Sequence, residues 1–464
     1  MEEVRTNRMT HFVVAARSTV ERARQARPVT TFTGREPWKI AGVPIFLITG
    51  WWALSLTIWA IGYPIPYVRV NLPLVIVLVG ACIIAATAGF LVVARALPGN
   101  VAPPVTRRRL PIPVLVGVIA MVVLLVPWAE YYSGYHLWQL GSALADQGGA
   151  YAAAAKRVAE GTAARTGIVL AQTALAPFTL AVIPVTALAW FERRRHLLLL
   201  VLALCVQAVM SFLVGRDFYV MTAALLVLAA WVLSRVRRRM APTWRGSLVF
   251  AGSVGLFVVA FTARKLSRGA LVSSQPLCLP GVAHCSAAHA PSLWDSLSTY
   301  VASYMSQSME GLGRAMSGVW AFGGGYRHSP VLTTIADSVG LPHARVITDQ
   351  LQSHGWSATD YWSTGWAWMA NDVPWFVVPV VVAALAALLG LTWRRAVRDA
   401  DWLSVTLFSH GWLTMFFLAQ NNVLTIDGPT YFGFLGLCVV FAVREVLRRS
   451  RRRRSSTSGA DVAA

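Results

Sequence analysis

Side chains that could carry acid–base chemistry gather in one polar part of the chain, residues 264–374, named here the polar segment. Five of the nine histidines lie there, together with Glu310 and Asp372. A reacting hydroxyl gives up its proton to a histidine or carboxylate held beside it. We therefore expect a general base in this segment and rank the candidates as His328, then Glu310, then Asp372.

The polar segment is much longer than an ordinary connecting loop, and such segments are usually functional or disordered. Disordered segments contain few aromatic residues, whereas this one is rich in tryptophan and tyrosine, so we expect it to fold. Four of its aromatic residues are candidates for positioning sugar rings by stacking: Tyr300, Tyr304, Trp356 and Trp362. For Trp366 and Trp368, an aromatic belt at the membrane surface is an equal alternative.

Residues 295–317 have the spacing of an amphipathic helix. One stripe is apolar and is expected to pack on the rest of the protein; it contains Val301, Met305, Met309, Leu312 and Met316. The nearly opposite face is polar and is expected to face a sugar; it contains Tyr300, Tyr304, Gln307, Gly311 and Arg314. Glu310 lies beside that face and can pair with Arg314 at the i, i+4 spacing.

A glycine run, Gly323–Gly325, precedes Arg327, His328 and Ser329. Three glycines allow a tight backbone path and the close approach of a ligand. The P-loop lysine is absent and no strand precedes the run, so a nucleotide site is not indicated. The alternative is a flexible turn. The three consecutive polar residues Arg327, His328 and Ser329 argue against it.

Arginines at the expected outer ends of apolar helices are candidates for binding a phosphate-bearing substrate. Arg216 lies in a short turn between two apolar runs, and Arg264 closes the end of another. The guanidinium group donates two parallel hydrogen bonds that suit phosphate oxygens. Arg314 or Arg327 could supply a third cation. The alternative is that these arginines bind no ligand and only extend their charged groups from the apolar helices to the water at the membrane surface.

Two of the five cysteines, Cys278 and Cys285, fall in the polar segment with a Pro-Gly turn between them. They are disulfide candidates if the segment lies in an oxidising compartment. Metal binding with His284 is the weaker alternative, because no second ligand pair of the usual spacing follows. No metal site and no cofactor are expected.

The elements that must position these residues are apolar helices. Of the 464 residues, 56% are hydrophobic and only 13% are charged, which differs from soluble domains in the direction of a membrane protein. The net charge of +21 arises from arginine clusters between apolar runs. That pattern indicates membrane topology better than nucleic-acid binding.

Ten apolar runs are long enough to cross a bilayer. They cover about residues 41–62, 72–95, 111–129, 167–190, 196–214, 218–235, 246–263, 375–393, 402–420 and 428–447. With the N-terminus in the cytoplasm, every dense arginine cluster falls on the cytoplasmic side. Both termini are then cytoplasmic, and the polar segment lies on the outer face.

The predicted fold is therefore an all-α polytopic membrane protein with one large outer-face loop domain. Its expected parts are a cytoplasmic tail (1–40), seven spans (41–263), the polar segment (264–374), three spans (375–447) and a basic cytoplasmic tail (448–464). The Asp399-to-Asp401 pair falls in a short cytoplasmic loop, where a solvated turn is expected.

A set of motifs in residues 200–440 resembles the O-antigen-polymerase-like (Wzy-like) family of bacterial oligosaccharide repeat-unit polymerases. The motifs are Tyr300-x3-Tyr304-x-Ser306-Gln307-x2-Glu310-Gly311-Leu312, Gly323–Gly325, Arg327-His328-Ser329-Pro330, His354-Gly355-Trp356 and Trp362-Ser363-Thr364. The chain departs from the family at Ser308-Met309-Glu310, where a Gly-Tyr-Tyr-like run is typical.

The resemblance implies a metal-independent, membrane-embedded (GT-C-like) glycosyltransferase in the bacterial cytoplasmic membrane. Such an enzyme would join oligosaccharide repeat units carried on polyprenyl diphosphate, on the outer face, to make a surface polysaccharide or exopolysaccharide. Membrane lipid, a flippase and chain-length regulator proteins are the expected partners, and nucleic acid is not.

Three alternatives stay open from the sequence. An O-antigen-ligase-like enzyme would use the same donor lipid for a single transfer. A lipid-linked glycan flippase or transporter would place charged residues in the middle of its spans, where this sequence has almost none. A non-enzymatic export partner would not depend on Arg216, Arg264 or His328.

Overall fold

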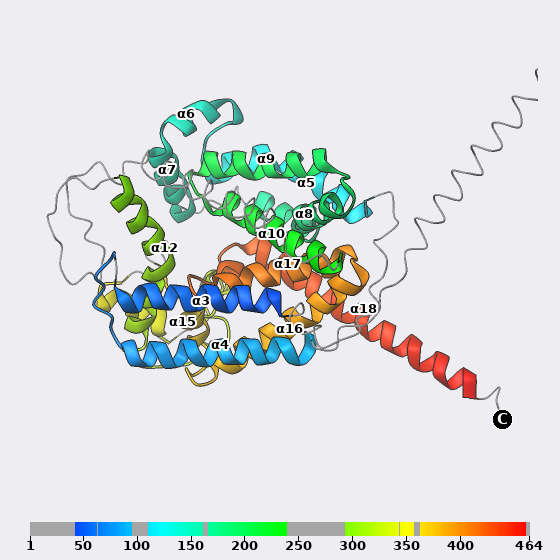
Figure 1. Cartoon of the computed structure of the whole chain (residues 1–464). Helices are drawn as coiled ribbons and strands as arrows, with labels where there is room; N and C mark the ends of the chain where they lie inside the picture. Colours follow the sequence, from blue (N-terminus) through cyan, green and yellow to red (C-terminus); the bar gives the residue numbers. More distant parts are fainter. Residues whose placement is uncertain are drawn as a thin grey trace, which may run out of the picture.

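The structure is a computed structural model that describes residues 42–62, 64–94, 110–160, 166–238, 293–342, 344–356 and 362–460. Within these ranges the chain is built from helices (Figure 1). Those long enough and apolar enough to cross a membrane are α3 (Val43–Ile61), α4 (Leu72–Ala94), α5 (Ile112–Tyr132), α8 (Thr166–Arg193), α9 (Leu197–Val214), α10 (Phe218–Arg237), α16 (Val378–Asp399) and the first part of α18 (Gly428–Ala460).

These eight helices match eight of the ten predicted spans and confirm a polytopic helical membrane protein. The predicted span at 246–263 lies outside the described residues. The predicted span at 402–420 is the helix α17 (Trp402–Phe417), which has 16 residues. At 1.5 Å per residue it covers about 24 Å, less than the roughly 30 Å of a hydrocarbon core.

Close helix packing at small residues holds the bundle together. Helices α4 and α16 approach so closely that a Cβ on Gly89 would lie 2.3 Å from the carbonyl oxygen of Ala383. A Cβ on Gly117 of α5 would likewise lie 2.2 Å from the oxygen of Phe178 in α8. In lipid, helix association depends on such close contact, because burial of apolar surface gives little driving force there. These glycines are therefore required by packing.

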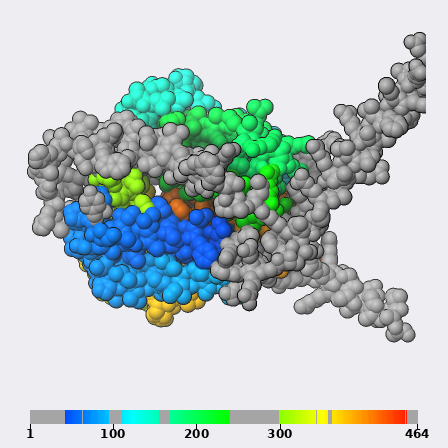
Figure 2. Space-filling view, in the orientation of Figure 1, coloured from blue at the N-terminus to red at the C-terminus, as the bar shows by residue number. Residues whose placement is uncertain are grey.

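Helix α17 joins two groups of helices. It contacts α3 and α16 on one side and α8, α10 and α18 on the other. It is buried along most of its length, including His410 near its middle. Figure 2 shows a hollow between the blue helix α3 and the green helices α9 and α10, with yellow-green residues of α12 (Leu293–Ala315) at one end of it.

Short helices cover one end of the bundle, named here the α12 end. They are α6 (Leu140–Ala145), α7 (Gln147–Glu160), α12, α13 (Pro330–Ser338), α14 (Ile347–Gln350) and α15 (Gly365–Ala370), with the 3-10 turns η1 (Leu137–Gln139), η3 (Leu351–His354) and η4 (Val423–Thr425). The C-terminal part of α18 projects from the opposite end of the bundle (Figure 1). That end is named here the basic end, because arginines of α16 and α18 gather there. The described part of the polar segment thus folds into helices and ordered turns.

Candidate functional site

His328 and Asp372 form a hydrogen-bonded pair at the α12 end. The Nδ1 atom of His328 lies 2.7 Å from Oδ2 of Asp372, and the same oxygen accepts the backbone N–H of His328 at 2.8 Å. The Asp372 side chain is 8% exposed and that of His328 is 34% exposed. The carboxylate is therefore enclosed, while the imidazole reaches the surface.

The glycine run folds around this carboxylate. Gly325 donates its backbone N–H to Oδ1 of Asp372 at 3.0 Å. Gly324 and Gly325 both have φ near +83°, a backbone conformation that side chains with a Cβ disfavour. A Cβ on Gly323 would lie 2.6 Å from Oδ1 of Asp372. The predicted tight backbone path is therefore present, and the group that the glycines approach is the Asp372 carboxylate; the approach of a ligand stays a prediction.

Two asparagines hold the backbone on either side of the pair. Asn371, which is fully buried, donates from Nδ2 to the carbonyl oxygen of Arg327 and to Oγ1 of Thr348, both at 2.9 Å. Asn422 donates from Nδ2 to the carbonyl oxygen of His328 at 2.9 Å. Because three separate parts of the chain meet at these bonds, the imidazole is fixed by the fold and not by its own loop alone.

The geometry sets the tautomer of His328. An ionised carboxylate only accepts hydrogen bonds, so Nδ1 carries the proton that points to Asp372. In the neutral ring, Nε2 then has a free lone pair. Burial alone would raise the pKa of Asp372, but the hydrogen bonds from His328 and Gly325 outweigh it and lower that pKa. The pair can therefore accept a proton at Nε2 and stabilise the resulting imidazolium.

Glu310, the second candidate base, lies in a different setting. It is fully buried, and its oxygens accept from Nε1 of Trp59 at 3.1 Å, from the backbone N–H of Arg69 at 3.0 Å and from Nε of Arg314 at 3.0 Å. These donors occupy both oxygens. The carboxylate therefore fastens α12 to α3 and to the turn before α4, and its burial with three donors makes it less suited than His328 to accept a proton from a substrate hydroxyl.

The polar face of α12 is largely covered by the polar segment itself. Trp356 is 2% exposed, and its Nε1 donates to the carbonyl oxygen of Trp362 at 2.9 Å. Its ring lies beneath the guanidinium of Arg314, 5.7 Å from ring centre to Cζ. Tyr304 meets the edge of the Trp362 ring at 5.2 Å. Three of the aromatic residues expected to stack on sugars thus contact other side chains of the fold: Tyr304 and Trp362 contact each other, and Trp356 contacts Arg314.

The four candidate cations differ in what they contact. Arg314 donates to Glu310 and, at 2.7 Å, to the carbonyl oxygen of His354. Arg327 is buried and forms an ion pair with Asp349. Both are therefore neutralised within the fold and are poorly suited to hold a diphosphate.

Arg216 forms no ion pair with any described residue. Its guanidinium lies 5.8 Å from the centre of the Tyr151 ring, and its side chain is half-buried in the turn between α9 and α10. It remains available to an anion. The other predicted sites, Arg264 and the cysteines Cys278 and Cys285, lie outside the described residues, as does the side chain of Tyr300 within α12.

Asp349 and Asn422 contribute to the site without any signal in the sequence. Each stands in a short polar run, Thr348–Gln350 or Gln420–Asn422, and each acts on a residue far along the chain. Asn371 stands directly beside Asp372, which is the only local indication of its role. Among the described residues, no three His, Cys, Asp or Glu side chains are close enough together to hold a metal ion.

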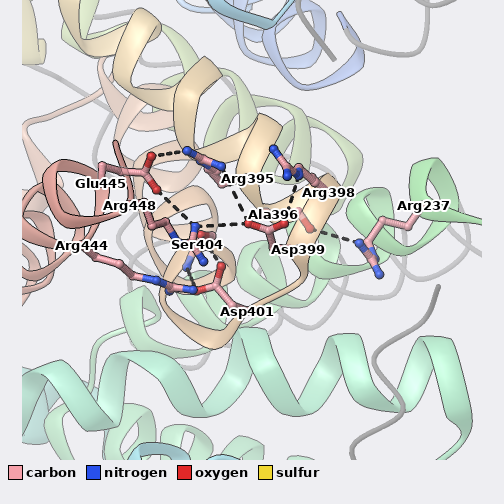
Figure 3. Close-up of polar contacts among 10 residues, drawn as sticks. All are labelled: Arg237, Arg395, Ala396, Arg398, Asp399, Asp401, Ser404, Arg444, Glu445 and Arg448. Atoms are coloured by element: carbon pink, nitrogen blue, oxygen red, sulfur yellow. Dashed lines mark hydrogen bonds and ion pairs between the residues drawn. The ribbon is translucent and has the colours of Figure 1, made fainter. Parts of the chain in front are cut away.

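The basic end carries a separate ion-pair network (Figure 3). Asp399 pairs with Arg398 and Arg448, each at 3.3 Å, and Asp401 pairs with Arg444 at 2.5 Å. The predicted turn is present between α16 and α17, but its carboxylates are not simply solvated, because Asp399 pairs with arginines of α16 and α18 and Asp401 with an arginine of α18. The network joins two helices and leaves neither aspartate free for a ligand.

Comparison of the chain with protein-family models, with curated proteins and with solved structures gives no match.

Proposed function

We propose that this protein is a glycosyltransferase that joins oligosaccharide units carried on polyprenyl diphosphate at the outer face of a bacterial cytoplasmic membrane. The observation that carries the proposal is the His328–Asp372 pair, in which a buried carboxylate orients an exposed imidazole. Such a pair is suited to deprotonate a hydroxyl. The motif resemblance to Wzy-like polymerases supports the choice of substrate.

The reaction follows from that pair. Nε2 of His328 takes the proton of an acceptor sugar hydroxyl, and the hydroxyl oxygen attacks the anomeric carbon of the donor sugar. The bond from that carbon to the diphosphate oxygen breaks, and the polyprenyl diphosphate leaves with the electron pair. Asp372 stabilises the imidazolium until the proton passes to solvent. No nucleotide is consumed, because the diphosphate lipid is itself the leaving group.

The leaving diphosphate needs a cation, and Arg216 fits this need best among the described candidates. It forms no ion pair with a residue that the structure describes, unlike Arg314 and Arg327. Positive charge placed where negative charge develops supplies several kcal/mol of stabilisation, on the order of 3 kcal/mol for a single donor. In the proposed topology the α12 end faces outward, so Arg216 and the His328–Asp372 pair, called the dyad below, both meet the substrate there.

Purified protein in lipid nanodiscs, incubated with a lipid-linked repeat unit, tests the proposal. Wild-type protein is expected to yield a ladder of products. His328→Ala should lower the initial rate by about 10²- to 10⁴-fold. His354→Ala is the matched control, because that side chain is exposed and His354 contacts Arg314 through its backbone oxygen; it should keep the wild-type rate.

Other outcomes distinguish the alternatives. One discrete product instead of a ladder identifies a ligase-like enzyme acting through the same dyad. Transfer at the wild-type rate by His328→Ala would show that His328 is not the base. No transfer by wild-type protein, while labelled lipid crosses the bilayer, defeats the enzymatic proposal and favours a flippase.

A further inference from the structure

A second polar and aromatic cluster lies at the α12 end, around Arg216. Three rings pack edge to face: Trp128 lies 6.0 Å from Tyr132 and 5.7 Å from Tyr219 between ring centres. Tyr151, which is 49% exposed, lies beneath the Arg216 guanidinium. We name these four rings, from α5, α7 and α10, the aromatic basket.

One donor in the basket is unused. Nε1 of Trp128 is buried and has no hydrogen-bond partner among the described residues. A buried N–H without a partner costs about 1–3 kcal/mol, so native proteins seldom leave one. The basket therefore offers a hydrogen-bond donor as well as apolar ring faces.

Two opposite charges flank the basket. Arg216 and Asp427 both lie near the phenols of Tyr132 and Tyr219. Neither charge forms an ion pair with a described residue. Asp427 instead accepts from the backbone N–H of Thr430 at 2.9 Å and from its Oγ1 at 2.6 Å. Those bonds fix the carboxyl group in position at the start of α18, and burial raises its pKa.

One segment, residues 422–428, links the basket to the dyad. At its start, Asn422 bonds the carbonyl oxygen of His328. At its end, a Cβ on Gly428 would lie 3.7 Å from Cγ1 of Val331, three residues beyond His328. Asp427, next to Gly428, acts on the basket tyrosines. The segment therefore borders both features, so a single substrate could reach from one to the other.

We propose that the aromatic basket, with Arg216 and Asp427, binds the sugar next to the diphosphate of the lipid-linked donor. This inference rests on the proposed function and names the subsite within it. Ring faces contact the apolar face of a pyranose, Asp427 accepts from its hydroxyls, and Trp128 donates to one of its oxygens. Arg216 holds the adjacent phosphate. A carboxylate accepts hydrogen bonds from sugar hydroxyls, whereas it repels a phosphate. Asp427 therefore favours the sugar-bearing lipid over the bare diphosphate lipid.

Binding measurements in nanodiscs test this subsite without requiring turnover. The two probes are bare polyprenyl diphosphate and the lipid-linked repeat unit extracted from cells that lack this protein. Asp427→Asn should weaken binding of the sugar-bearing lipid about tenfold, the loss expected for a charged hydrogen bond, and should not weaken binding of the bare diphosphate. Arg216→Gln should weaken both. Asp337→Asn, an exposed carboxylate of α13, is the control and should change neither.

Tyr151→Leu gives a second test that leaves the three mutually packed rings intact, and it should also weaken only the sugar-bearing probe. Equal weakening of both probes, or no change, by Asp427→Asn and Tyr151→Leu would overturn the subsite. The proposed function fails separately, if wild-type protein binds both lipids yet forms no transfer product. Unfolding curves of each variant identify any that do not fold.

Discussion

One oxygen of Asp372 accepts two hydrogen bonds from the same residue, the ring Nδ1 and the backbone N–H of His328, at 2.7 and 2.8 Å. The carboxylate thus fixes both the position of the histidine backbone and the orientation of its ring. Its other oxygen bonds the glycine run. The geometry of the site therefore depends more on the buried side chain of Asp372 than on His328, the residue that would accept the proton.

Asp372→Asn should lower activity strongly while leaving a folded protein. An amide has one accepting oxygen and an NH₂ that cannot accept, so either His328 or Gly325 loses its acceptor. We expect the transfer rate to fall by about 10²- to 10⁴-fold, as when an orienting carboxylate of a histidine base is removed. The initial rate with lipid-linked repeat unit measures this. A rate within twofold of wild type would show that the pair is structural only.

Acid should destabilise the α12 end through Asp372. Its pKa in the folded protein is below the ordinary value of 3.8, so the folded state favours the carboxylate. That contribution is fully present above pH 3.8 and is lost as pH falls through the lowered pKa. The measurement is amide hydrogen exchange of residues 323–329 from pH 6 downward. In Asp372→Ala these amides should exchange faster than in wild type already at pH 6. Their protection in the variant should then depend less on further acidification than it does in wild type.

The sequence allowed the membrane helices and the local pair on α12 to be predicted, because both depend on neighbours along the chain. Hydropathy located eight described spans to within a few residues, and the i, i+4 pairing of Glu310 with Arg314 is present at 3.0 Å. The apolar stripe of α12 is buried as expected, with Met309 and Leu312 fully enclosed.

Long-range partners could not be predicted in this way. Arg327 looks like a free phosphate ligand until the fold brings Asp349 beside it. Glu310 looks like a candidate base until Trp59, 251 residues away, donates to it. A side chain's chemistry depends on whether its charge is already satisfied, and sequence spacing does not report that.

Glu310→Ala should affect stability more than chemistry. Removing one partner of a buried charge pair costs about 3–5 kcal/mol, because the other charge stays buried. Arg314 keeps its bond to the His354 carbonyl, which offsets part of that cost. We expect a lower unfolding midpoint in detergent and a near-normal rate per folded molecule. A fully folded variant without transfer activity would instead make Glu310 a participant in the reaction.

His410 compensates for a proline in the neighbouring helix, and this relationship can be tested by a double-mutant cycle. Pro184 has no N–H, so the carbonyl of Leu180, four residues earlier, lacks its helical donor. Nε2 of His410 donates to that oxygen at 3.0 Å. His410→Ala should therefore cost about 1–3 kcal/mol by leaving the carbonyl unsatisfied away from water. In a Pro184→Ala background the helix supplies its own donor, so the same substitution should cost much less. Chemical unfolding in detergent measures the four proteins of the cycle, and a coupling energy near zero would show that His410 has another reason to be buried.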